Sequence, residues 1–402
     1  MRWAGRLGVL AACVAAPVAP AAADGPITDR DYAIDFYEGI AIGSTTQVGM
    51  GGAGSALIVG SAGNLLNASA PAVRMTTDTD GWNWDYHFDL LTGKYSTDYD
   101  NNGVVIDPDD QNSAGASLFT VGIGGRYRNW AMAVTIEAQT APIAPRTAGE
   151  PTTLTADALR TKIVLAKWIP QLDLAVGIGV QPVTFQVVEI AGPQLFRITG
   201  TGATAGATWV PRMQDFRVAA SLESSISGGQ VDSTCDPLNC RGYILPDHVE
   251  VPARVIVGGA YRLSETRWNQ LVGGGFRDEP SLTLAADVVI TGSSPNGYGI
   301  EAFGLQRLQR SGEHVAVSMR GGAEYEWLPG RLRVRAGSYW EPQRFERLAG
   351  FGSTAGRIHA TFGADVRVFE FQLWGRRRGR IGLTADLASR YKNIALSVGL
   401  WH

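Results

Sequence analysis

Acidic and amide side chains recur at alternate positions in one segment of the chain, a spacing suited to a hard cation. Asp98, Asp100, Asn102 and Asp109 stand at positions 1, 3, 5 and 12 of a loop of the EF-hand type, with Gly103 at position 6. Oxygen ligands at alternate positions can wrap a calcium ion, and glycine permits the sharp turn. The last position lacks a glutamate and no flanking helices are apparent, so a solvated acidic turn is the alternative. The loop is a candidate for structural calcium, and no other cofactor is indicated.

Arginine residues recur in the C-terminal third of the chain, at positions that alternate with apolar residues. A guanidinium group binds a carboxylate as a two-pronged fork, so these arginines could recognise an acidic ligand. The candidates are Arg320, Arg333, Arg335 and Arg357. Glutamates and aspartates occupy the same alternating positions, so ion pairs between neighbouring strands are the competing explanation.

Motifs for catalysis and for nucleic-acid binding are lacking. The chain has no Gly-x-Ser-x-Gly motif, and its five histidines have no recognisable nucleophile beside them. A formal net charge of -3 provides no basic footprint for nucleic acid. We therefore expect neither an enzyme nor a nucleic-acid partner.

The N-terminus has the layout of a secretory signal peptide over residues 1–23. Two arginines precede an apolar stretch at residues 7–16, and three alanines end at residue 23. A lipoprotein cleavage site before Cys13 is the alternative, although the apolar core in front of it would be short. Export places the remaining cysteines, Cys235 and Cys240, in an oxidising compartment, where a disulfide between them is expected.

Apolar and polar residues alternate over segments of roughly ten residues along most of the chain, as in the strands of a membrane barrel. At the C-terminus Ile394, Leu396, Val398 and Leu400 are expected to face lipid, in a pattern that the barrel-assembly machinery reads in relatives. A secreted β-sandwich would also alternate, but sandwiches rarely place several arginines per strand on one face. No segment after the signal has the ~18 uninterrupted apolar residues of a membrane helix.

The pattern predicts an all-β fold, a transmembrane antiparallel barrel of fourteen strands over residues 79–402. The expected strands are 80–92, 116–128, 129–140, 156–169, 171–190, 193–212, 214–226, 249–263, 279–292, 313–328, 331–343, 355–371, 379–391 and 392–402. The weakly patterned segment 297–310 is expected to be loop or helix, because bacterial barrels almost always have an even number of strands.

Residues 24–78 differ from the rest of the chain. They are rich in Gly, Ala and Ser and show no strand alternation. Fourteen strands enclose a lumen too wide for side chains alone to fill. We therefore expect this segment to form a small plug inside the barrel.

The plug segment resembles the N-terminal hatch of the FadL-type outer-membrane transporters, a family that includes TodX. The resemblance rests on Gly49, Gly51, Gly52 and Gly54 in a glycine-rich run, followed by Asn67. Asn67-Ala68-Ser69-Ala70-Pro71 stands where that family has Asn-Pro-Ala. Shorter matches follow in order, among them 206–211, 284–287 and 332–337.

The resemblance implies passive transport of hydrophobic compounds, such as long-chain fatty acids or hydrocarbons, across the outer membrane of a Gram-negative bacterium. In that family the ligand leaves sideways through a break in the barrel wall. The expected partners are therefore hydrophobic small molecules, outer-membrane lipid and the barrel-assembly machinery. The alternative is a barrel of the PorV kind, which does not transport and serves as a surface or secretion scaffold. An apolar tunnel beside the plug would favour transport, and a solidly packed lumen would favour the scaffold.

Overall fold

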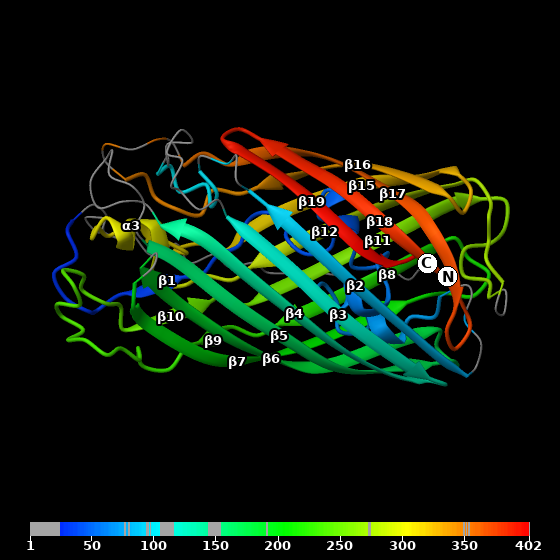
Figure 1. Ribbon diagram of the computed structural model, residues 1–402, viewed down its shortest axis with the longest axis horizontal. Coiled ribbons are helices and arrows are strands. Elements are labelled where there is room, and N and C mark those ends of the chain that lie inside the picture. The colour runs from blue at the N-terminus through cyan, green and yellow to red at the C-terminus, as the bar shows by residue number, and fades with distance from the viewer. Residues whose placement is uncertain are drawn as a thin grey trace, which may run out of the picture.

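Fourteen strands close a single antiparallel barrel in the computed structural model (Figure 1). The structure describes residues 25–75, 78, 81–93, 96, 98–104, 116–143, 154–189, 192–271, 275–348, 350, 352 and 354–401. The signal-peptide segment 1–23 and Asp109 lie outside these residues. The barrel strands are β2 (Trp82–Thr92), β3 (Ser117–Tyr127), β4 (Trp130–Ile143), β5 (Leu154–Ile169), β6 (Leu174–Glu189), β7 (Gln194–Trp209), β8 (Phe216–Glu223), β11 (Arg254–Ser264), β12 (Ser281–Thr291), β15 (Ala316–Leu328), β16 (Leu332–Glu341), β17 (Arg357–Gln372), β18 (Arg376–Ala388) and β19 (Tyr391–Leu400). Each corresponds to one of the fourteen predicted segments, so that prediction is confirmed.

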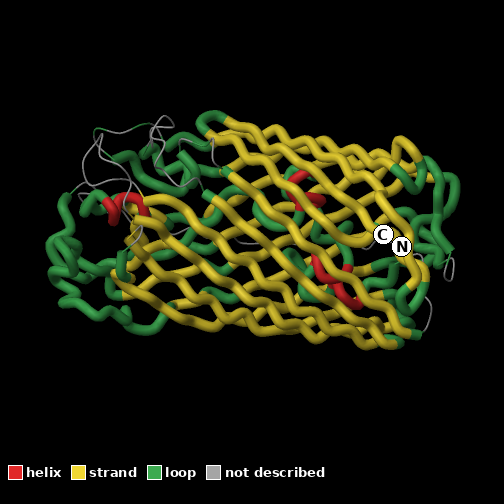
Figure 2. The backbone as a smooth tube through the Cα atoms, viewed as in Figure 1, coloured by secondary structure: helices red, strands yellow, loops and turns green. Residues whose placement is uncertain are grey.

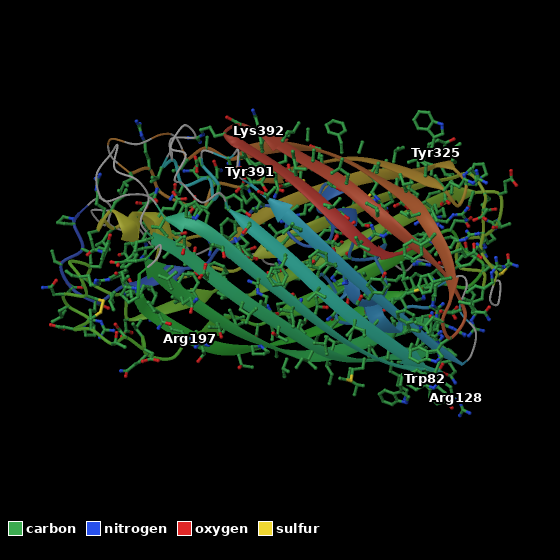
Figure 3. The ribbon with its side chains drawn as sticks, in the orientation of Figure 1. Trp82, Arg128, Arg197, Tyr325, Tyr391 and Lys392 are labelled. Carbon is green, nitrogen blue, oxygen red and sulfur yellow. A yellow bond between two sulfur atoms is a disulfide. The ribbon has the colours of Figure 1, made fainter. Side chains whose placement is uncertain are left out.

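The outer surface of the barrel is apolar and the lumen is polar, as alternation requires. In β2 the side chains of Trp82 and Phe88 are 67% and 43% exposed, whereas Asp85 and Asp89 on the opposite face of the strand are buried. Aromatic residues such as Trp82 and Tyr325 lie near the same end of the barrel (Figure 3), as in a membrane interface girdle. Among the described residues, no helix has the length and apolar character needed to cross a membrane.

The two ends of the barrel differ in the length of their connections. The left end in Figure 1 carries the long loops, including residues 224–253 and 292–315, and most turns at the right end are short. Outer-membrane barrels have short periplasmic turns and longer extracellular loops. The long-loop end therefore faces the cell exterior, and the right end faces the periplasm.

A five-stranded sheet lies at the extracellular end, in the order β14 (Arg310–Ser311), β13 (Gly297–Tyr298), β1 (Ala33–Asp35), β10 (His248–Val251), β9 (Ile226–Ser227). The sheet corrects two predictions. The predicted plug segment 24–78 contains the strand β1, and the single strand predicted over 249–263 is divided into β10 and β11. Proline lacks the backbone N–H that a ladder needs, and the chain leaves this sheet at Pro252 before it joins the barrel at β11. Pairing with loop strands orders β1, which has no alternation of its own.

Three short helices belong to the plug inside the lumen. They are α1 (Thr45–Gly49), α2 (Gly60–Gly63) and the single 3-10 turn η1 (Ala70–Ala72). Figure 2 shows helical segments enclosed by the strands of the barrel, and α1 contacts β17 and β18 while α2 contacts β2. We call residues 36–75 the hatch. A further helix, α3 (Ile300–Gly304), lies in an extracellular loop, so the expectation of loop or helix over 297–310 holds for its middle but is wrong at its ends, where β13 and β14 pair in the extracellular sheet.

The end of β19 departs from the prediction. Ile394, Leu396 and Val398 are 45%, 49% and 37% exposed, as expected for lipid-facing residues, but Leu400 is 3% exposed and lines a cavity in the lumen. The ladder between β19 and β2 ends at the Gly399–His87 pair. Beyond this point β2 no longer fixes the side chains of β19, and Leu400 turns inward.

Candidate functional site

Glycines of the hatch motif allow its backbone to run directly against the barrel wall. Gly51 and Gly52 have φ values of +63° and +75°, in the left-handed region that glycine tolerates best. A Cβ atom on Gly51 would lie 2.5 Å from the backbone nitrogen of Ser338. Gly49 packs against Arg335, and a Cβ on Gly54 would clash within the hatch itself. The motif is thus used for close packing of the hatch.

Three inward-facing aspartates of the barrel hold the hatch through its backbone. Asp287 of β12 accepts hydrogen bonds from the backbone N–H groups of Gly54 and Ser55, both at 2.9 Å. On β2, Asp85 accepts one from the Ser61 N–H at 2.6 Å, and Asp89 accepts one from the Thr45 N–H at 2.7 Å. Sequence reasoning missed these residues. The sequence signal that could have found them is an aspartate at an inward-facing position with no arginine or lysine close to it in the chain.

Asn67 is the polar centre of the C-terminal part of the hatch. It is fully buried, and its side-chain nitrogen donates to the Thr208 hydroxyl at 3.0 Å. Its side-chain oxygen accepts hydrogen bonds from the backbone N–H and the hydroxyl of Ser69, at 3.0 and 2.8 Å. Asn67 therefore joins the hatch to β7.

A small cavity of about 50 Å³ lies above the hatch, beneath the extracellular loops. We call it the outer pocket. Apolar side chains form much of its wall, including Phe36, Ile143, Ala158, Ile300 and Phe345. The charged side chains among its described lining residues are all acidic, namely Asp35, Glu38, Asp100, Glu301 and Glu341. The pocket thus combines an apolar wall with acidic groups, of which Asp35, Glu38 and Glu341 are paired with Arg344, Arg160 and Arg357. Glu38 also lines a smaller cavity of about 20 Å³ beside the hatch.

A second cavity, of about 110 Å³, lies toward the periplasmic end, and we call it the inner cavity. Its apolar wall is formed by Leu57, Ile58 and Val59 of the hatch together with Leu400 of β19. Its polar wall contains five arginines and two carboxylates: Arg217, Arg262, Arg333, Arg335, Arg380, Glu324 and Asp365. The hatch thus stands between an outer pocket lined by acidic groups and an inner cavity lined mainly by arginines.

Two of the arginines predicted to bind ligand line the inner cavity. Arg335 bridges Glu324 at 2.7 Å and Asp365 at 2.6 Å, and all three side chains are buried. Arg333 pairs with Glu326 at 3.0 Å. Both arginines therefore form cross-strand ion pairs, and their contact with a ligand stays a prediction.

The other two arginines hold loop and hatch backbone. Arg320 donates to the carbonyl oxygen of Gly39 in the hatch at 3.3 Å. Arg357 pairs with Glu341 and donates to the carbonyl oxygen of Asp98 at 2.7 Å. These side chains position the segments that surround the outer pocket.

The acidic loop lies at the edge of the outer pocket. Asp98 and Asn102 are fully buried, and Asp98 accepts hydrogen bonds from the Gly103 N–H at 3.2 Å and from Arg390 at 3.1 Å. The predicted fourth ligand, Asp109, lies outside the described residues. The structure places a different carboxylate nearby, that of Glu301 in α3, which sequence reasoning missed because it is some 200 residues distant in the chain.

Burial and mutual repulsion raise the pKa values of these carboxyl groups. Burial, followed by the charge of Asp98, raises the pKa of Asp100 to about 8. Burial and the charges of Asp100 and Asp98 raise the pKa of Glu301 well above its usual range. Among the described residues, no three His, Cys, Asp or Glu side chains lie close enough together to hold a metal ion without moving.

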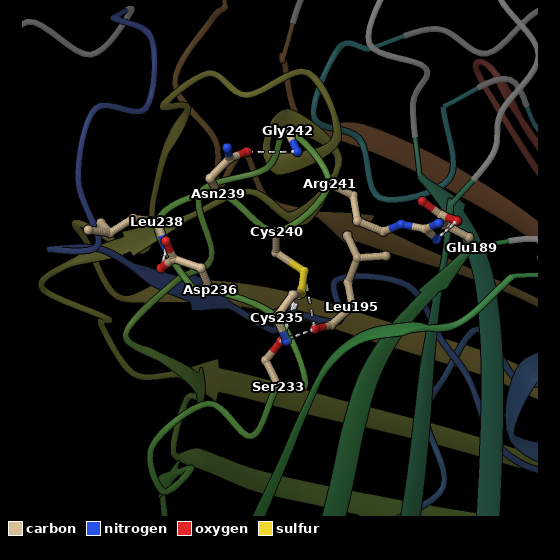
Figure 4. The surroundings of a disulfide bond; sticks show 10 residues. All are labelled: Glu189, Leu195, Ser233, Cys235, Asp236, Leu238, Asn239, Cys240, Arg241 and Gly242. Carbon is tan, nitrogen blue, oxygen red and sulfur yellow. Dashed lines mark hydrogen bonds and ion pairs between the residues drawn. A yellow bond between two sulfur atoms is a disulfide. The ribbon is translucent and has the colours of Figure 1, made fainter.

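Cys235 and Cys240 form a disulfide in the extracellular loop between β9 and β10 (Figure 4). Cys240 is buried, and the neighbouring Ser233 hydroxyl donates to the carbonyl oxygen of Leu195 at 2.7 Å. The bridge fastens this loop over the start of β7. The disulfide has a structural role, and neither cysteine lines the outer pocket or the inner cavity.

Solved structures share this architecture, although neither a protein-family model nor a curated protein sequence matches the chain. A FadL homologue from Pseudomonas aeruginosa aligns with a TM-score of 0.56 and 13% identity, over 90% of this chain and 99% of its own. The chain has the fold of the FadL-type channels. The CymD monoaromatic hydrocarbon channel aligns with a TM-score of 0.52 and 13% identity, over 90% of this chain and 97% of its own. The FadL-type fold, with its closed fourteen-stranded barrel and apolar exterior, is that of a protein of the Gram-negative outer membrane.

Proposed function

We propose that the protein passively transports hydrophobic compounds, such as hydrocarbons or long-chain fatty acids, across the outer membrane. The observation that carries the proposal is the pair of cavities with apolar walls, one on each side of the hatch. An apolar solute leaves water spontaneously for an apolar pocket, so entry needs no energy source. The similarity to a monoaromatic hydrocarbon channel supports the same class of solute.

The lining of the outer pocket favours uncharged solutes over anions. Its described lining residues include no cationic side chain, so a carboxylate entering from outside would lose its hydration without gaining a partner, whereas an aromatic or aliphatic hydrocarbon would not. The arginines of the inner cavity lie beyond the hatch, where they meet a solute only after it has entered. We therefore place hydrocarbons ahead of fatty acids as substrates.

A seam in the barrel wall offers a sideways exit near the inner cavity. β19 ends at Leu400, so residues 82–86 of β2 and 376–378 of β18 have no strand between them. Side chains span this seam: the Trp84 ring nitrogen donates to the Leu373 carbonyl at 3.2 Å, and Arg377 donates to Asn83 at 2.6 Å. Side-chain rotation can open such a seam without breaking a ladder. We propose it as the route into the membrane.

Uptake by intact cells tests transport, because the outer leaflet is the barrier that the protein is proposed to bypass. Expression in a Gram-negative host without a channel of this kind should accelerate uptake of a labelled monoaromatic hydrocarbon, and less so of a labelled long-chain fatty acid. Ala158→Trp fills the outer pocket and should remove most of the acceleration. The matched control is Leu159→Trp, which changes the next residue of β5 on the lipid face, where Leu159 is 45% exposed.

Two results would contradict the proposal. One is equal uptake with and without the protein, with a folded barrel confirmed in the outer membrane. The other is equal uptake through Ala158→Trp and wild-type protein, which would show that solutes do not pass through the outer pocket. The first result would favour the scaffold alternative, for which capture of a folded protein by the extracellular loops would be the next measurement.

A further inference from the structure

Two carboxylates at the mouth of the outer pocket lack a cationic partner. Nearby acids are neutralised, since Asp98 pairs with Arg390, and Glu341 pairs with Arg357. Asp100 and Glu301 have no ion pair with any described residue, although both line the outer pocket. A buried carboxylate without a partner is costly, and two that repel each other are more so. A cation bound between them would relieve this repulsion.

The same place gathers oxygen atoms without hydrogen-bond donors. Asp98 Oδ1, Asp100 Oδ2 and Glu301 Oε2 are buried and unpartnered among the described residues. The side chains of Asp98 and Glu301 are 0% and 4% exposed. Two amide oxygens nearby, Asn101 Oδ1 and Gln309 Oε1, are also buried without a hydrogen-bond partner. Buried polar atoms nearly always have a hydrogen-bond partner in native proteins. Five buried oxygen atoms without such a partner in one region therefore indicate a missing ligand that binds oxygen atoms, such as a metal ion.

Two polypeptide segments meet at this point. The acidic loop, residues 98–104, connects β2 to β3, and α3 lies in the loop between β12 and β15. Gln309 donates to the carbonyl oxygen of Asn102 at 2.7 Å, and Val104 packs with Leu348 and Leu305. The acidic loop and α3 are therefore held against each other by contacts that do not involve the carboxylates, and the carboxylate side chains must rotate to surround one ion.

We propose that Asp98, Asp100 and Glu301 bind one calcium ion, which joins the acidic loop to α3 over the outer pocket. Calcium accepts six to eight oxygen ligands in flexible geometry, whereas magnesium requires a near-ideal octahedron. Glu301 takes the place expected from sequence for Asp109. The ion braces two extracellular loops at the mouth of the pocket, and its binding is independent of whether the barrel transports.

Calorimetry on the purified full-length protein in detergent micelles, stripped with EDTA, tests the site. Wild-type protein should bind one calcium ion with a Kd of roughly 0.1–1 mM, the range of extracellular calcium modules. Glu301→Gln should weaken binding at least tenfold. Terbium should give luminescence excited through tyrosine, since Tyr99 lies between two of the ligands, and calcium should displace it. Asp247→Asn is the control, because that loop carboxylate is 58% exposed and should leave binding unchanged.

Thermal unfolding distinguishes whether Glu301 is a calcium ligand or has only a structural role. In EDTA, Glu301→Gln should melt at or above the temperature of wild type, because it relieves repulsion among buried carboxylates. In calcium the order should reverse, because only wild type gains stability from the ion. Absence of heat and of any thermal shift in millimolar calcium, with a folded barrel, would overturn the proposal. Wild-type affinity in Glu301→Gln would overturn it as well.

Discussion

Replacing Gly322 with valine should release the hatch from the barrel wall. A Cβ atom at Gly322 would lie 2.5 Å from the carbonyl oxygen of Met50, which is hatch backbone and cannot rotate away. Overpacking of this kind costs about 1–3 kcal/mol, enough to raise the undocked population by roughly 5- to 150-fold. A barrel of this width without its plug admits water-soluble molecules. Cells expressing Gly322→Val should become permeable to a large hydrophilic antibiotic that wild-type cells exclude.

The neighbouring glycine provides the control. Gly321 precedes Gly322 on β15 and points to the lipid face, where an added Cβ would make an ordinary contact at 3.6 Å with the Ala285 carbonyl. Gly321→Val introduces the same side chain into the same strand and should leave the cells impermeable. If both variants behaved like wild type while folded barrel was present, close packing of the hatch would not be what seals the lumen.

Replacing Arg335 with methionine should cause the largest loss of stability in the barrel wall. Its guanidinium group bridges Glu324 and Asp365, and all three side chains are buried. Removing one partner from a buried ion pair leaves charge without compensation and costs about 3–5 kcal/mol. Urea unfolding of the refolded protein, followed by tryptophan fluorescence, should show a midpoint well below that of wild type.

Two further variants test whether burial of the ion pairs causes this loss of stability. Arg376→Met removes an arginine that pairs with Glu370 at the surface of the barrel, where its side chain is 61% exposed, so the midpoint should hardly move. Adding Glu324→Gln to Arg335→Met should recover part of the loss, because one uncompensated charge disappears. Equal effects of Arg335→Met and Arg376→Met would show that burial of the network is not what makes it important.

Local alternation made the wall of the barrel predictable. A strand between lipid and lumen must alternate, so β2 and β17 could be located from their own residues. The exceptions occur where neighbours decide the outcome. Leu400 continues the alternation in sequence but turns inward, because the ladder with β2 has ended at Gly399. Likewise, β1 exists because loop strands pair with it, a condition that its own sequence does not carry.

The lumen was less predictable than the wall, because its contacts join distant segments. The hatch glycines and Asn67 could be singled out locally, but their counterparts on the barrel, such as Asp287, depend on which strand lies opposite. The cavities arise from the fit of hatch and wall together. The inner cavity, for instance, needs Leu57 of the hatch to face Arg217 of β8 and Arg335 of β16.

The sequence by itself thus determined an exported barrel of fourteen strands, a plug at its N-terminus and an acidic loop, since each depends on residues close together in the chain. Only the tertiary structure decided which arginines are held in ion pairs, where the cavities lie, and that Glu301 stands beside Asp98 and Asp100. Barrel closure sets these contacts, because it brings loops from opposite ends of the chain to one mouth. Residue spacing cannot encode such contacts, whereas the closed ladder of strands fixes them.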